Sequence, residues 1–230
     1  MTVLTEDPSH FNAELDKRVV IKPEDYQWID SPMPGVERMR LDRIDEEFDR
    51  VTTVVRYAPN SEFSSHTHTG GEEFYVLDGV FSDEHADYPK GSYVRNPIGT
   101  AHTPRIGSQG ATIFVKLYQF DTADTEQKAI NTNTNEWLPG LVDGLQVMPL
   151  HQHINENVAL VKWAPNTVFN PHKHWGGEEI FVIEGTFYDE HGSYPAGTWI
   201  RSPHLSEHAP FTKGDGAVIY VKTGHLATFA

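Results

Sequence analysis

The sequence predicts an all-β protein that consists of two tandem domains arising from an internal repeat. Two observations support this prediction. One long block of residues occurs twice at a fixed separation, and both halves of the chain hold short runs of β-branched and aromatic residues between turn-forming residues. The chain has 230 residues. That length suffices for two domains of about 100 to 130 residues, each able to bury a core.

The repeat is clearest in a block that begins with a histidine pair. Residues 66–79, HTHTGGEEFYVLDG, align with residues 172–185, HKHWGGEEIFVIEG, at an offset of 106. Upstream of this block the offset becomes 109, so the first copy contains three additional residues, which we place within residues 42–49. We therefore predict an N-terminal domain of residues 1–125 and a C-terminal domain of residues 126–230.

Short runs rich in Val, Ile, Tyr, Phe and Thr predict the strands of each domain. They are separated by clusters of Gly, Pro, Asn or Asp, and examples are residues 51–57, 74–77, 112–118 and 218–222. Their imperfect alternation is expected when one strand face points into a barrel and the other packs against a neighbouring sheet. The polar segment of residues 121–136 has little to bury, and we interpret it as the linker between the copies.

The charge balance argues against two classes of partner. The chain has 18 Lys and Arg residues against 33 Asp and Glu residues, a formal charge of −15, so its surface repels nucleic acid and anionic membranes. No apolar run approaches the roughly 20 residues of a membrane helix. The N-terminal residues are acidic and polar, unlike a signal peptide, and we therefore expect a cytoplasmic protein.

The absence of cysteine directs attention to the 13 histidines. Without cysteine the chain can form neither a disulfide nor a thiolate metal site, so a transition metal has to be held by His and carboxylate. His66 and His68 are separated by one residue, and on a strand that spacing turns both imidazoles to one face. Glu72 and His102 follow and complete a set of four residues that can bind a metal.

The second copy repeats this set as His172, His174, Glu178 and His208. A single His-x-His pair on a strand is usually solvated or hydrogen-bonded, but chance does not repeat four liganding residue types at the same spacing. Three imidazole nitrogens and one carboxylate oxygen suit a divalent first-row metal and leave coordination positions for water or substrate. We therefore predict two metal sites per chain.

The two blocks resemble the two sequence motifs of the cupin superfamily, G-x5-HxH-x3,4-E-x6-G and G-x5-PxG-x2-H-x3-N. The finer pattern, with GGEE, DEH, Y-P-x-G and an Arg before the Pro, is similar to the cupin domain of ChrR-type anti-sigma factors. Asn60 replaces the first glycine of motif one in the first copy, and Leu205 replaces the glycine after the proline of motif two in the second copy. These departures concern loop geometry more than metal binding.

The resemblance implies a bicupin, in which two small jelly-roll β-barrels each hold a metal ion. In ChrR-like cupins the implied metal is zinc. The anti-sigma function does not carry over, because the helical domain that grips the sigma factor uses a His and a Cys pair on zinc, and this chain has no cysteine.

Four repeated residues are candidates for the ligand pocket. Tyr93 and Arg95 share strand parity, as do Trp199 and Arg201 in the second copy. If these side chains face the pocket, each arginine favours a carboxylate or enolate substrate. The alternative is that each arginine forms a structural salt bridge between strands, and the sequence favours neither interpretation.

The residues next to the liganding glutamates divide between two faces. Phe74 and Ile180 share the strand parity of those glutamates and are expected to wall the cavity, although core packing also explains both. Glu73 and Glu179 are expected on the other strand face, where each can form a hydrogen bond or an ion pair.

Two function classes follow from the motifs and the resemblance. The first is a metal-dependent enzyme of the cupin dioxygenase type, acting on a small enolisable or phenolic ketone with Fe, Ni or Mn. The alternative is a ChrR-like zinc-binding sensor without catalysis, because zinc has no redox chemistry. Both classes imply a small-molecule ligand, and a homodimer through an edge strand is compatible with the fold.

Overall fold

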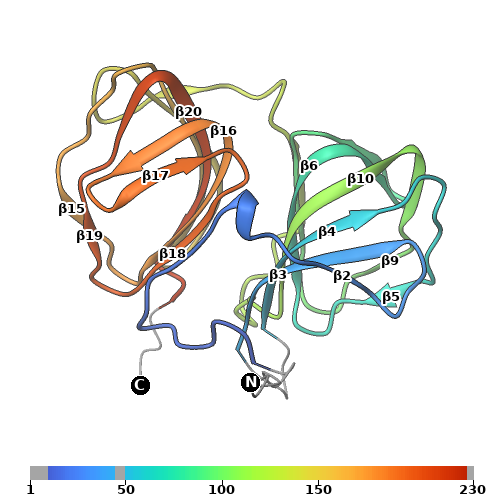
Figure 1. Cartoon of the computed structure of the whole chain (residues 1–230). Helices are drawn as coiled ribbons and strands as arrows, with labels where there is room; N and C mark the ends of the chain where they lie inside the picture. The colour runs from blue at the N-terminus through green and yellow to red at the C-terminus, as the bar shows by residue number, and fades with distance from the viewer. Residues whose placement is uncertain (1–9, 45–49, 227–230) are drawn as a thin grey trace, which may run out of the picture. The chain divides into compact units, whose positions relative to one another are not determined.

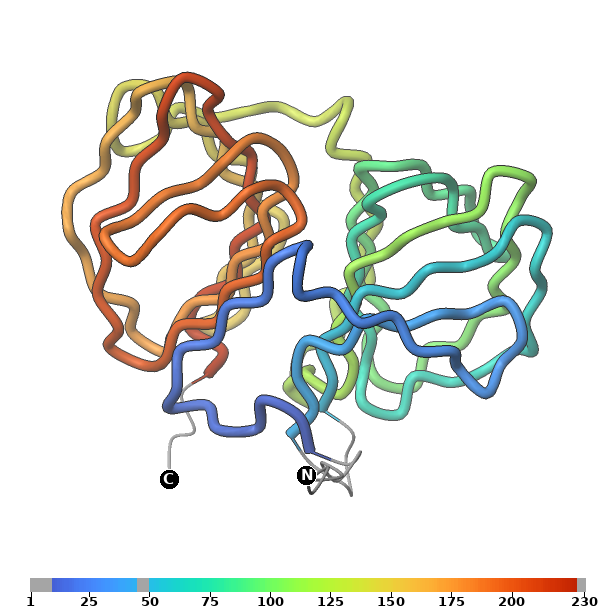
Figure 2. Tube along the Cα trace, in the orientation of Figure 1, coloured from blue at the N-terminus to red at the C-terminus, as the bar shows by residue number. Residues whose placement is uncertain are grey.

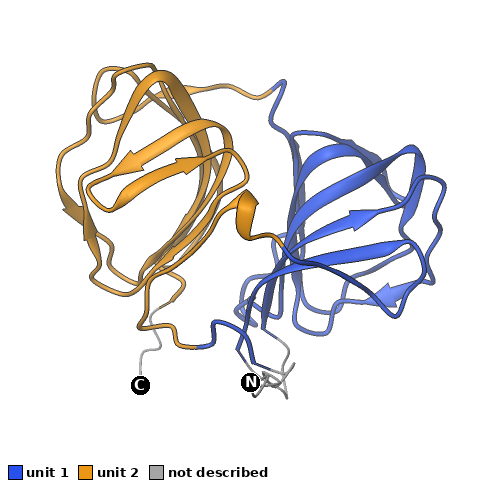
Figure 3. Cartoon of the chain, in the orientation of Figure 1, with its two compact units in different colours: residues 1–13, 27–134 blue, residues 14–26, 135–230 orange. Residues whose placement is uncertain are grey.

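The computed structural model describes residues 10–44 and 50–226, and it confirms the all-β fold (Figure 1). The chain forms two compact units, each with one eight-stranded antiparallel sheet and one two-stranded sheet (Figure 3). The three additional residues of the first copy were expected within residues 42–49, of which 45–49 lie outside the described residues. In the described ranges no helix is long and apolar enough to cross a membrane.

The first unit comprises Met1–Ala13 and Gln27–Thr134. Its large sheet has the order β11-β8-β6-β10-β4-β3-β2, with β7 paired to β6, and β5 pairs with β9 in the small sheet. The strands are β2 (Trp28–Asp30), β3 (Val36–Arg43), β4 (Val51–Tyr57), β5 (His66–Thr67), β6 (Glu72–Ser82), β7 (Asp87–Pro89), β8 (Ser92–Asn96), β9 (Ala101–His102), β10 (Arg105–Leu117) and β11 (Lys128–Asn131).

The second unit comprises Glu14–Tyr26 and Asn135–Ala230 and repeats this topology. Its large sheet has the order β1-β18-β16-β20-β14-β13-β12, with β17 paired to β16, and β15 pairs with β19. The elements are β1 (Val19–Ile21), the short 3-10 helix η1 (Pro23–Asp25), β12 (Leu138–Pro139), β13 (Leu145–His153), β14 (Glu156–Trp163), β15 (His172–Lys173), β16 (Glu178–Asp189), β17 (Gly192–Pro195), β18 (Trp199–Ser202), β19 (Glu207–His208) and β20 (Phe211–Thr223).

Glycine shapes the long β6–β10 pair, where the register shifts between Ile106 and Ala111. Gly79 has a φ of 70°, and a Cβ there would lie 2.1 Å from the carbonyl oxygen of Gly110. Only glycine tolerates both the left-handed backbone and so close an approach, so it permits the bend that curves the sheet.

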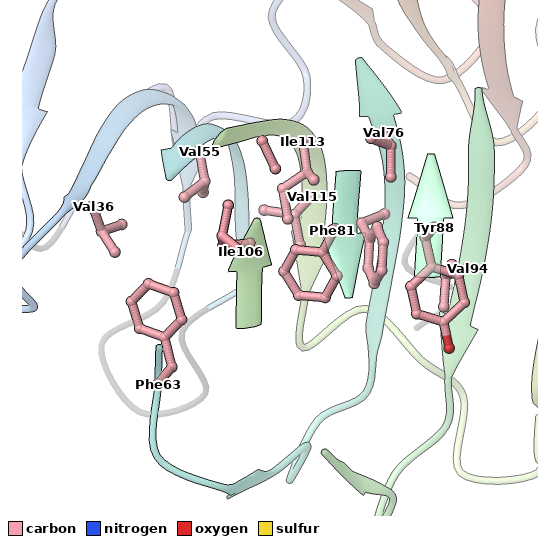
Figure 4. Packing of buried hydrophobic residues seen from close by; sticks show 12 residues of the cluster. Val36, Val55, Phe63, Val76, Phe81, Tyr88, Val94, Ile106, Ile113 and Val115 are labelled. Atoms are coloured by element: carbon pink, nitrogen blue, oxygen red, sulfur yellow. The ribbon is translucent and has the colours of Figure 1, made fainter. Parts of the chain in front are cut away.

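Each unit has its own apolar core inside its barrel. Figure 4 shows the first, in which Val76 and Phe81 of β6 lie in one buried cluster with Val94 of β8 and Val115 of β10. Phe74 of β6 belongs to the same cluster. The second core contains Trp163, Ile180, Val182, Phe187 and Ile219. The inward-facing side chains of these strands thus line the interior of each barrel. The metal-binding candidates point into the same interior.

The strand at the start of each sequence copy joins the large sheet formed mainly by the other copy. β1 pairs with β18 in the second unit, with Val20 opposite Ile200, and Figure 2 shows this N-terminal segment in blue beside the orange trace. β11 pairs with β8 in the first unit, with Ala129 opposite Val94. Residues 19–21 and 128–130 are equivalent at the offset of 109, so the exchange is reciprocal.

Because of this exchange, the bounds of the two compact units differ from those of the expected domains, 1–125 and 126–230. Residues 14–26 belong to the second unit, and the first unit extends to residue 134. The segment 121–136 is also more than a linker, because it supplies β11 and buries Asp124 and Thr132. A repeat shows which segments are equivalent, but backbone hydrogen bonds decide which sheet each strand joins.

Candidate metal centres

The first candidate centre lies where two short strands meet. His66 on β5 lies directly opposite His102 on β9, and His68 follows one residue beyond the end of β5. One imidazole nitrogen from each of the three lies within 4.8 Å of the others, and the Nε2 atoms of His66 and His102 are 3.2 Å apart. The pairing of β5 with β9 therefore brings together histidines that lie more than 30 residues apart in the sequence.

Glu72 at the start of β6 adds a carboxylate to this group. Its Oε2 lies 3.7 Å from Nδ1 of His68 and 3.8 Å from Nε2 of His102. The amide of Asn96, opposite Glu72 on β8, donates a hydrogen bond of 3.0 Å to the same oxygen and fixes its position. Three nitrogens and one oxygen thus converge, with His68, Glu72 and His102 buried and His66 exposed at the edge of the group.

The second candidate centre has the same construction. His172 on β15 lies opposite His208 on β19, and their nitrogens and that of His174 lie within 4.8 Å of one another. Oε2 of Glu178 lies 3.4 Å from Nε2 of His174 and 3.6 Å from Nε2 of His208. Asn170 accepts a hydrogen bond from Nδ1 of His172 at its carbonyl oxygen, at 2.9 Å, which leaves Nε2 of that ring for the centre.

Unpaired buried atoms show that these groups fit a cation. Within the described residues, Nε2 of His68, Nε2 of His174 and Oε2 of Glu178 are buried and have no hydrogen-bond partner. A buried polar atom without a partner costs free energy, and a divalent ion bound by several of them would satisfy them together. The two histidine groups could therefore each hold a metal ion.

Most of these histidines have a lowered pKa, so their imidazoles are neutral at neutral pH, which is the form that binds a metal. Burial, reinforced by the neighbouring histidines, lowers the pKa of His68 and of His174 to about 3 in each case. Burial also lowers the pKa of His102 and of His172. His208 differs: burial opposes its protonation, but the interaction with Asp189 and the charge of Glu178 outweigh burial and raise its pKa.

The two glutamates respond to burial in the opposite sense. Burial raises the pKa of Glu72 to about 7, although the hydrogen bond from Asn96 opposes the shift. Burial likewise raises the pKa of Glu178 to about 7, with the charge of His208 acting against it. In the metal-free protein each carboxyl therefore gains or loses its proton near neutral pH.

Metal uptake by the first centre is expected to weaken below pH 7. A protonated Glu72 has to lose its proton before it binds a metal, so the apparent affinity should fall up to about tenfold per pH unit below its pKa and level off above it. Chelator competition across this range measures the profile, in a chain whose second centre is disabled by His172→Ala and His174→Ala. Glu72→Gln should lower the affinity and flatten the profile, and an equally steep profile in that variant would assign the proton to another group.

A carboxylate lies behind one histidine of each centre, and its role there was not predicted from the sequence. Oδ2 of Asp83 lies 3.3 Å from Nδ1 of His102, and its Oδ1 accepts hydrogen bonds from the backbone amides of His85 and Ala86 and from the hydroxyl of Tyr88. Such a carboxylate orients a liganding imidazole and raises its basicity. The repeated Asp-Glu-His sequence was the available signal, but it is equally typical of a hairpin turn.

Asp189 occupies the same place in the second unit. Its Oδ2 lies 3.7 Å from Nδ1 of His208, and its Oδ1 accepts hydrogen bonds from the backbone amides of His191 and Gly192 and from the hydroxyl of Tyr194. Burial raises the pKa of Asp189, but the interaction with His208, the hydrogen bonds from Tyr194 and His191 and the charge of Arg18 outweigh it and lower the pKa to about 2, so Asp189 remains a carboxylate at neutral pH.

Tyr93 and Arg95 do not face the first centre, contrary to the pocket expectation. Arg95 lies opposite Glu73 on the sheet and forms ion pairs with Glu73 and Asp124, and Tyr93 donates a hydrogen bond of 3.0 Å to Glu73. Glu73 and Glu72 are adjacent on one strand, so their side chains leave opposite faces of the sheet. The salt-bridge alternative therefore describes Arg95, and Glu73 points away from the centre as expected.

Trp199 and Arg201 lie on the corresponding face in the second unit. Trp199 donates a hydrogen bond of 2.7 Å from Nε1 to Glu179, and Arg201 donates one of 3.0 Å to the carbonyl oxygen of Glu14. Glu179 also lies 2.9 Å from Nε2 of His225. These side chains support the sheet from the face opposite Glu178 and line no part of the metal-binding interior.

Phe74 and Ile180 lie on the inner faces of their sheets. The ring of Phe74 is 4.9 Å from that of Phe81, which in turn is 5.8 Å from the ring of His102. Ile180 is buried in the second core and lies opposite Val221. Both residues therefore pack in the cores, which is the alternative that the sequence also allowed.

An apolar cavity of about 170 Å³ adjoins the second centre. Its polar residues are His172, Glu178 and His208, and Leu141, which is 88% exposed, marks where it meets solvent. The remaining walls are Leu145, Val147, Val161, Trp163, Phe169, Phe187, Pro210, Ile219 and Val221. A molecule in this cavity would contact the candidate metal ligands at one end and hydrocarbon elsewhere.

The first barrel is more polar at two equivalent positions. Arg38 stands at the position of Val147 and lies opposite Val55, as Val147 lies opposite Val161. Tyr57 stands at the position of Trp163. Burial and the charge of Glu72 raise the pKa of Tyr57, while Arg38 acts against them, so the two barrels differ in the polarity that a ligand would meet.

Comparison with known proteins places the chain in a family. The model of the ChrR Cupin-like domain matches it twice, over residues 16–121 and 125–227. A search of curated proteins found no match.

Solved structures with a similar fold include three that this chain matches over 89% or more of its length. A proposed dioxygenase from Nostoc punctiforme has a TM-score of 0.77 and 18% identity, over 94% of this chain and 85% of its own. A proposed glyoxylate-induced protein from Pseudomonas aeruginosa has a TM-score of 0.74 and 14% identity, over 93% and 91%. A variant of Bacillus subtilis oxalate decarboxylase has a TM-score of 0.64 and 13% identity, over 89% and 76%. At these identities the likeness concerns the fold.

The two family matches together span most of the chain, and each contains one of the two histidine groups. The protein therefore belongs to the ChrR Cupin-like domain family, as a bicupin with two copies of that domain.

Proposed function

We propose that the protein is a metal-dependent enzyme of the cupin dioxygenase type that acts on a small enolisable or phenolic ketone. The metal ligands in this proposal are His66, His68, Glu72 and His102 in the first centre and His172, His174, Glu178 and His208 in the second. The observation that carries the proposal is the cavity beside the second centre, because it leaves room for a small molecule next to the candidate ligands.

The walls of this cavity favour an uncharged, largely apolar substrate. Its charged or titratable lining residues all belong to the candidate metal set, so within the described residues no further cation lines it to bind a carboxylate. Apolar walls also exclude water from the reacting group. A ketone or its enol places one or two oxygens near the centre and hydrocarbon against the walls.

Trp163 supplies a hydrogen-bond donor for such a substrate. It lines the cavity and is 6% exposed, and its buried Nε1–H has no hydrogen-bond partner among the described residues. An unpaired buried donor is costly, so a carbonyl oxygen that accepts its hydrogen bond would bind more tightly than a hydrocarbon of the same size. Trp163 would then orient the substrate towards the centre.

The remaining chemistry depends on the bound ion. A divalent first-row metal would supply Lewis acidity and, if it is redox-active, electron transfer with dioxygen. The chain contributes neutral imidazole nitrogens, one carboxylate that reduces the net charge of the centre, and a largely apolar cavity. Asp83 and Asp189 would hold His102 and His208 in their tautomers with the proton on Nδ1.

Metal content and oxygen consumption test this function together. Protein purified without an affinity tag or added metal is expected to contain iron, nickel or manganese, and to consume dioxygen with a small β-diketone or phenolic ketone. Trp163→Phe, which keeps the apolar wall but removes the donor, should lower kcat/KM by about tenfold or more and leave the metal content unchanged. Metal at background level would contradict the proposal.

The alternative is a zinc-binding sensor, and the match to the ChrR Cupin-like domain supports it. About two zinc ions per chain, without oxygen consumption, would favour this alternative, because zinc is redox-inert. The cytoplasmic location, the homodimer and the absence of nucleic-acid or membrane partners remain predictions.

A further inference from the structure

The two candidate centres differ in the residues that contact the supporting carboxylate, which is Asp83 in the first centre and Asp189 in the second. In the second unit Arg18 lies 3.0 Å from Oδ2 of Asp189 and donates a hydrogen bond of 2.8 Å to the hydroxyl of Tyr194. The same Oδ2 faces Nδ1 of His208 at 3.7 Å. The side chain of Asp189 is 1% exposed, so this arginine is a close counter-charge to a buried carboxylate.

The first unit has a different residue at the equivalent position. At the offset of 109, Arg18 corresponds to Gln127, whose amide donates a hydrogen bond of 3.4 Å to the side-chain oxygen of Asn96. Within the described part of the chain, no Arg or Lys pairs with Asp83. Asp83 lies 3.3 Å from Nδ1 of His102, closer than Asp189 lies to His208.

The physical consequence concerns the donor strength of His208. A carboxylate that accepts the second N–H of a liganding imidazole makes its other nitrogen a better donor and adds negative charge near the cation. Arg18 shares the oxygen that faces His208 and neutralises it, so it diminishes both effects. Because the segment that carries Arg18 comes from the first sequence copy, the strand exchange is what delivers this charge to the second unit.

We propose that Arg18 sets the metal affinity of the second centre, by weakening the support that Asp189 gives to His208. Arg18 acts mainly through Asp189 and is a positioning residue, and its charge also reaches Glu178 more weakly. The proposal depends on the metal binding proposed above. A comparison between the two centres does not isolate the effect, because Asn96 also acts on Glu72 in the first centre; a substitution within the second centre does.

The test uses the full chain with His66→Ala and His68→Ala, so that only the second centre binds. Zn²⁺ and Co²⁺ affinities are measured by chelator competition for Arg18→Gln, which installs the residue of the first copy, and for Arg18→Lys, which keeps the charge. Removing the carboxylate partner of a liganding histidine costs about 10- to 100-fold in affinity. The side chain of Arg18 is 29% exposed, so screening reduces its influence. Arg18→Gln is therefore expected to raise the affinity about 3- to 10-fold, and Arg18→Lys to change it less than about twofold.

A double-mutant cycle separates this effect from a structural one. In an Asp189→Asn background Arg18→Gln should raise the affinity by less than about twofold, because the carboxylate that Arg18 neutralises is gone and only its weaker charge effect on Glu178 remains. Loss of packing around β1 would lower the affinity, so the expected increase cannot come from partial unfolding. An unchanged or lower affinity in Arg18→Gln, or an equally large increase in the Asp189→Asn background, would overturn the inference. Absence of binding in the parent chain and in the background variant would instead contradict the proposed metal centres.

Discussion

Replacing His66 and His68 together by alanine is expected to remove one metal ion per chain and leave the other in place. The first histidine group lies in the first unit and the second group in the second unit, so neither centre borrows a candidate ligand from the other. A centre that loses two of its four ligands no longer competes with water and buffer for a divalent ion. Plasma mass spectrometry should show a fall from about two ions per chain to about one.

Two matched variants control this result. His172→Ala with His174→Ala should remove the other ion and also leave about one per chain. His153→Ala should leave the metal content unchanged. His153 forms a His-x-His pair with His151, but no Glu or later His at the repeated spacing completes a ligand set there. Loss of both ions from the His66 and His68 variant would show that the two units do not fold or bind independently.

Replacing Arg95 by methionine is expected to destabilise the first unit strongly without releasing its metal. Arg95 and Glu73 are each 1% exposed and Asp124 is 5% exposed, so the substitution leaves two buried carboxylates without their shared cation. Removing one partner of a buried ion pair costs about 3–5 kcal/mol. Urea unfolding should show this loss, while the metal content at low temperature stays near that of the parent, because Arg95 lies on the sheet face opposite Glu72.

An exposed ion pair provides the comparison. Arg105 and Asp87 are 3.4 Å apart with side chains 61% and 69% exposed, so Arg105→Met should change the free energy of unfolding by less than about 1 kcal/mol. If Arg95→Met left stability unchanged but weakened ligand binding, Arg95 would belong to the pocket after all.

The histidine groups were accessible from the sequence because their geometry is local. His66 and His68 need only a short strand to share a face, and the same spacing recurs at His172 and His174. The third histidine of each set required one further assumption, that β9 and β19 return beside β5 and β15, and the pairing of those strands meets it. The resemblance to the two cupin motifs supports the same assumption, because the second motif contributes this histidine.

The orientation of Arg95 was not accessible in the same way. Strand parity shows that Tyr93 and Arg95 share a face, but it does not say which face is the interior. The register does, because Asn96 lies opposite Glu72 and Arg95 lies opposite Glu73. Parity within one strand shows which side chains share a face, but the pairing of β6 with β8 is needed to show that the face of Arg95 is the one opposite Glu72.

By itself the sequence determined the all-β fold, the repeat and the residue types that can bind a metal, because these depend on composition and on short, regular spacings. The tertiary structure decided which sheet β1 and β11 join, that Asp83 and Asp189 support His102 and His208, and that Arg18 reaches Asp189. Each of these depends on contacts between residues far apart in the chain. Two segments at equivalent places in the fold can therefore put different charges beside two similar centres, as Arg18 and Gln127 do.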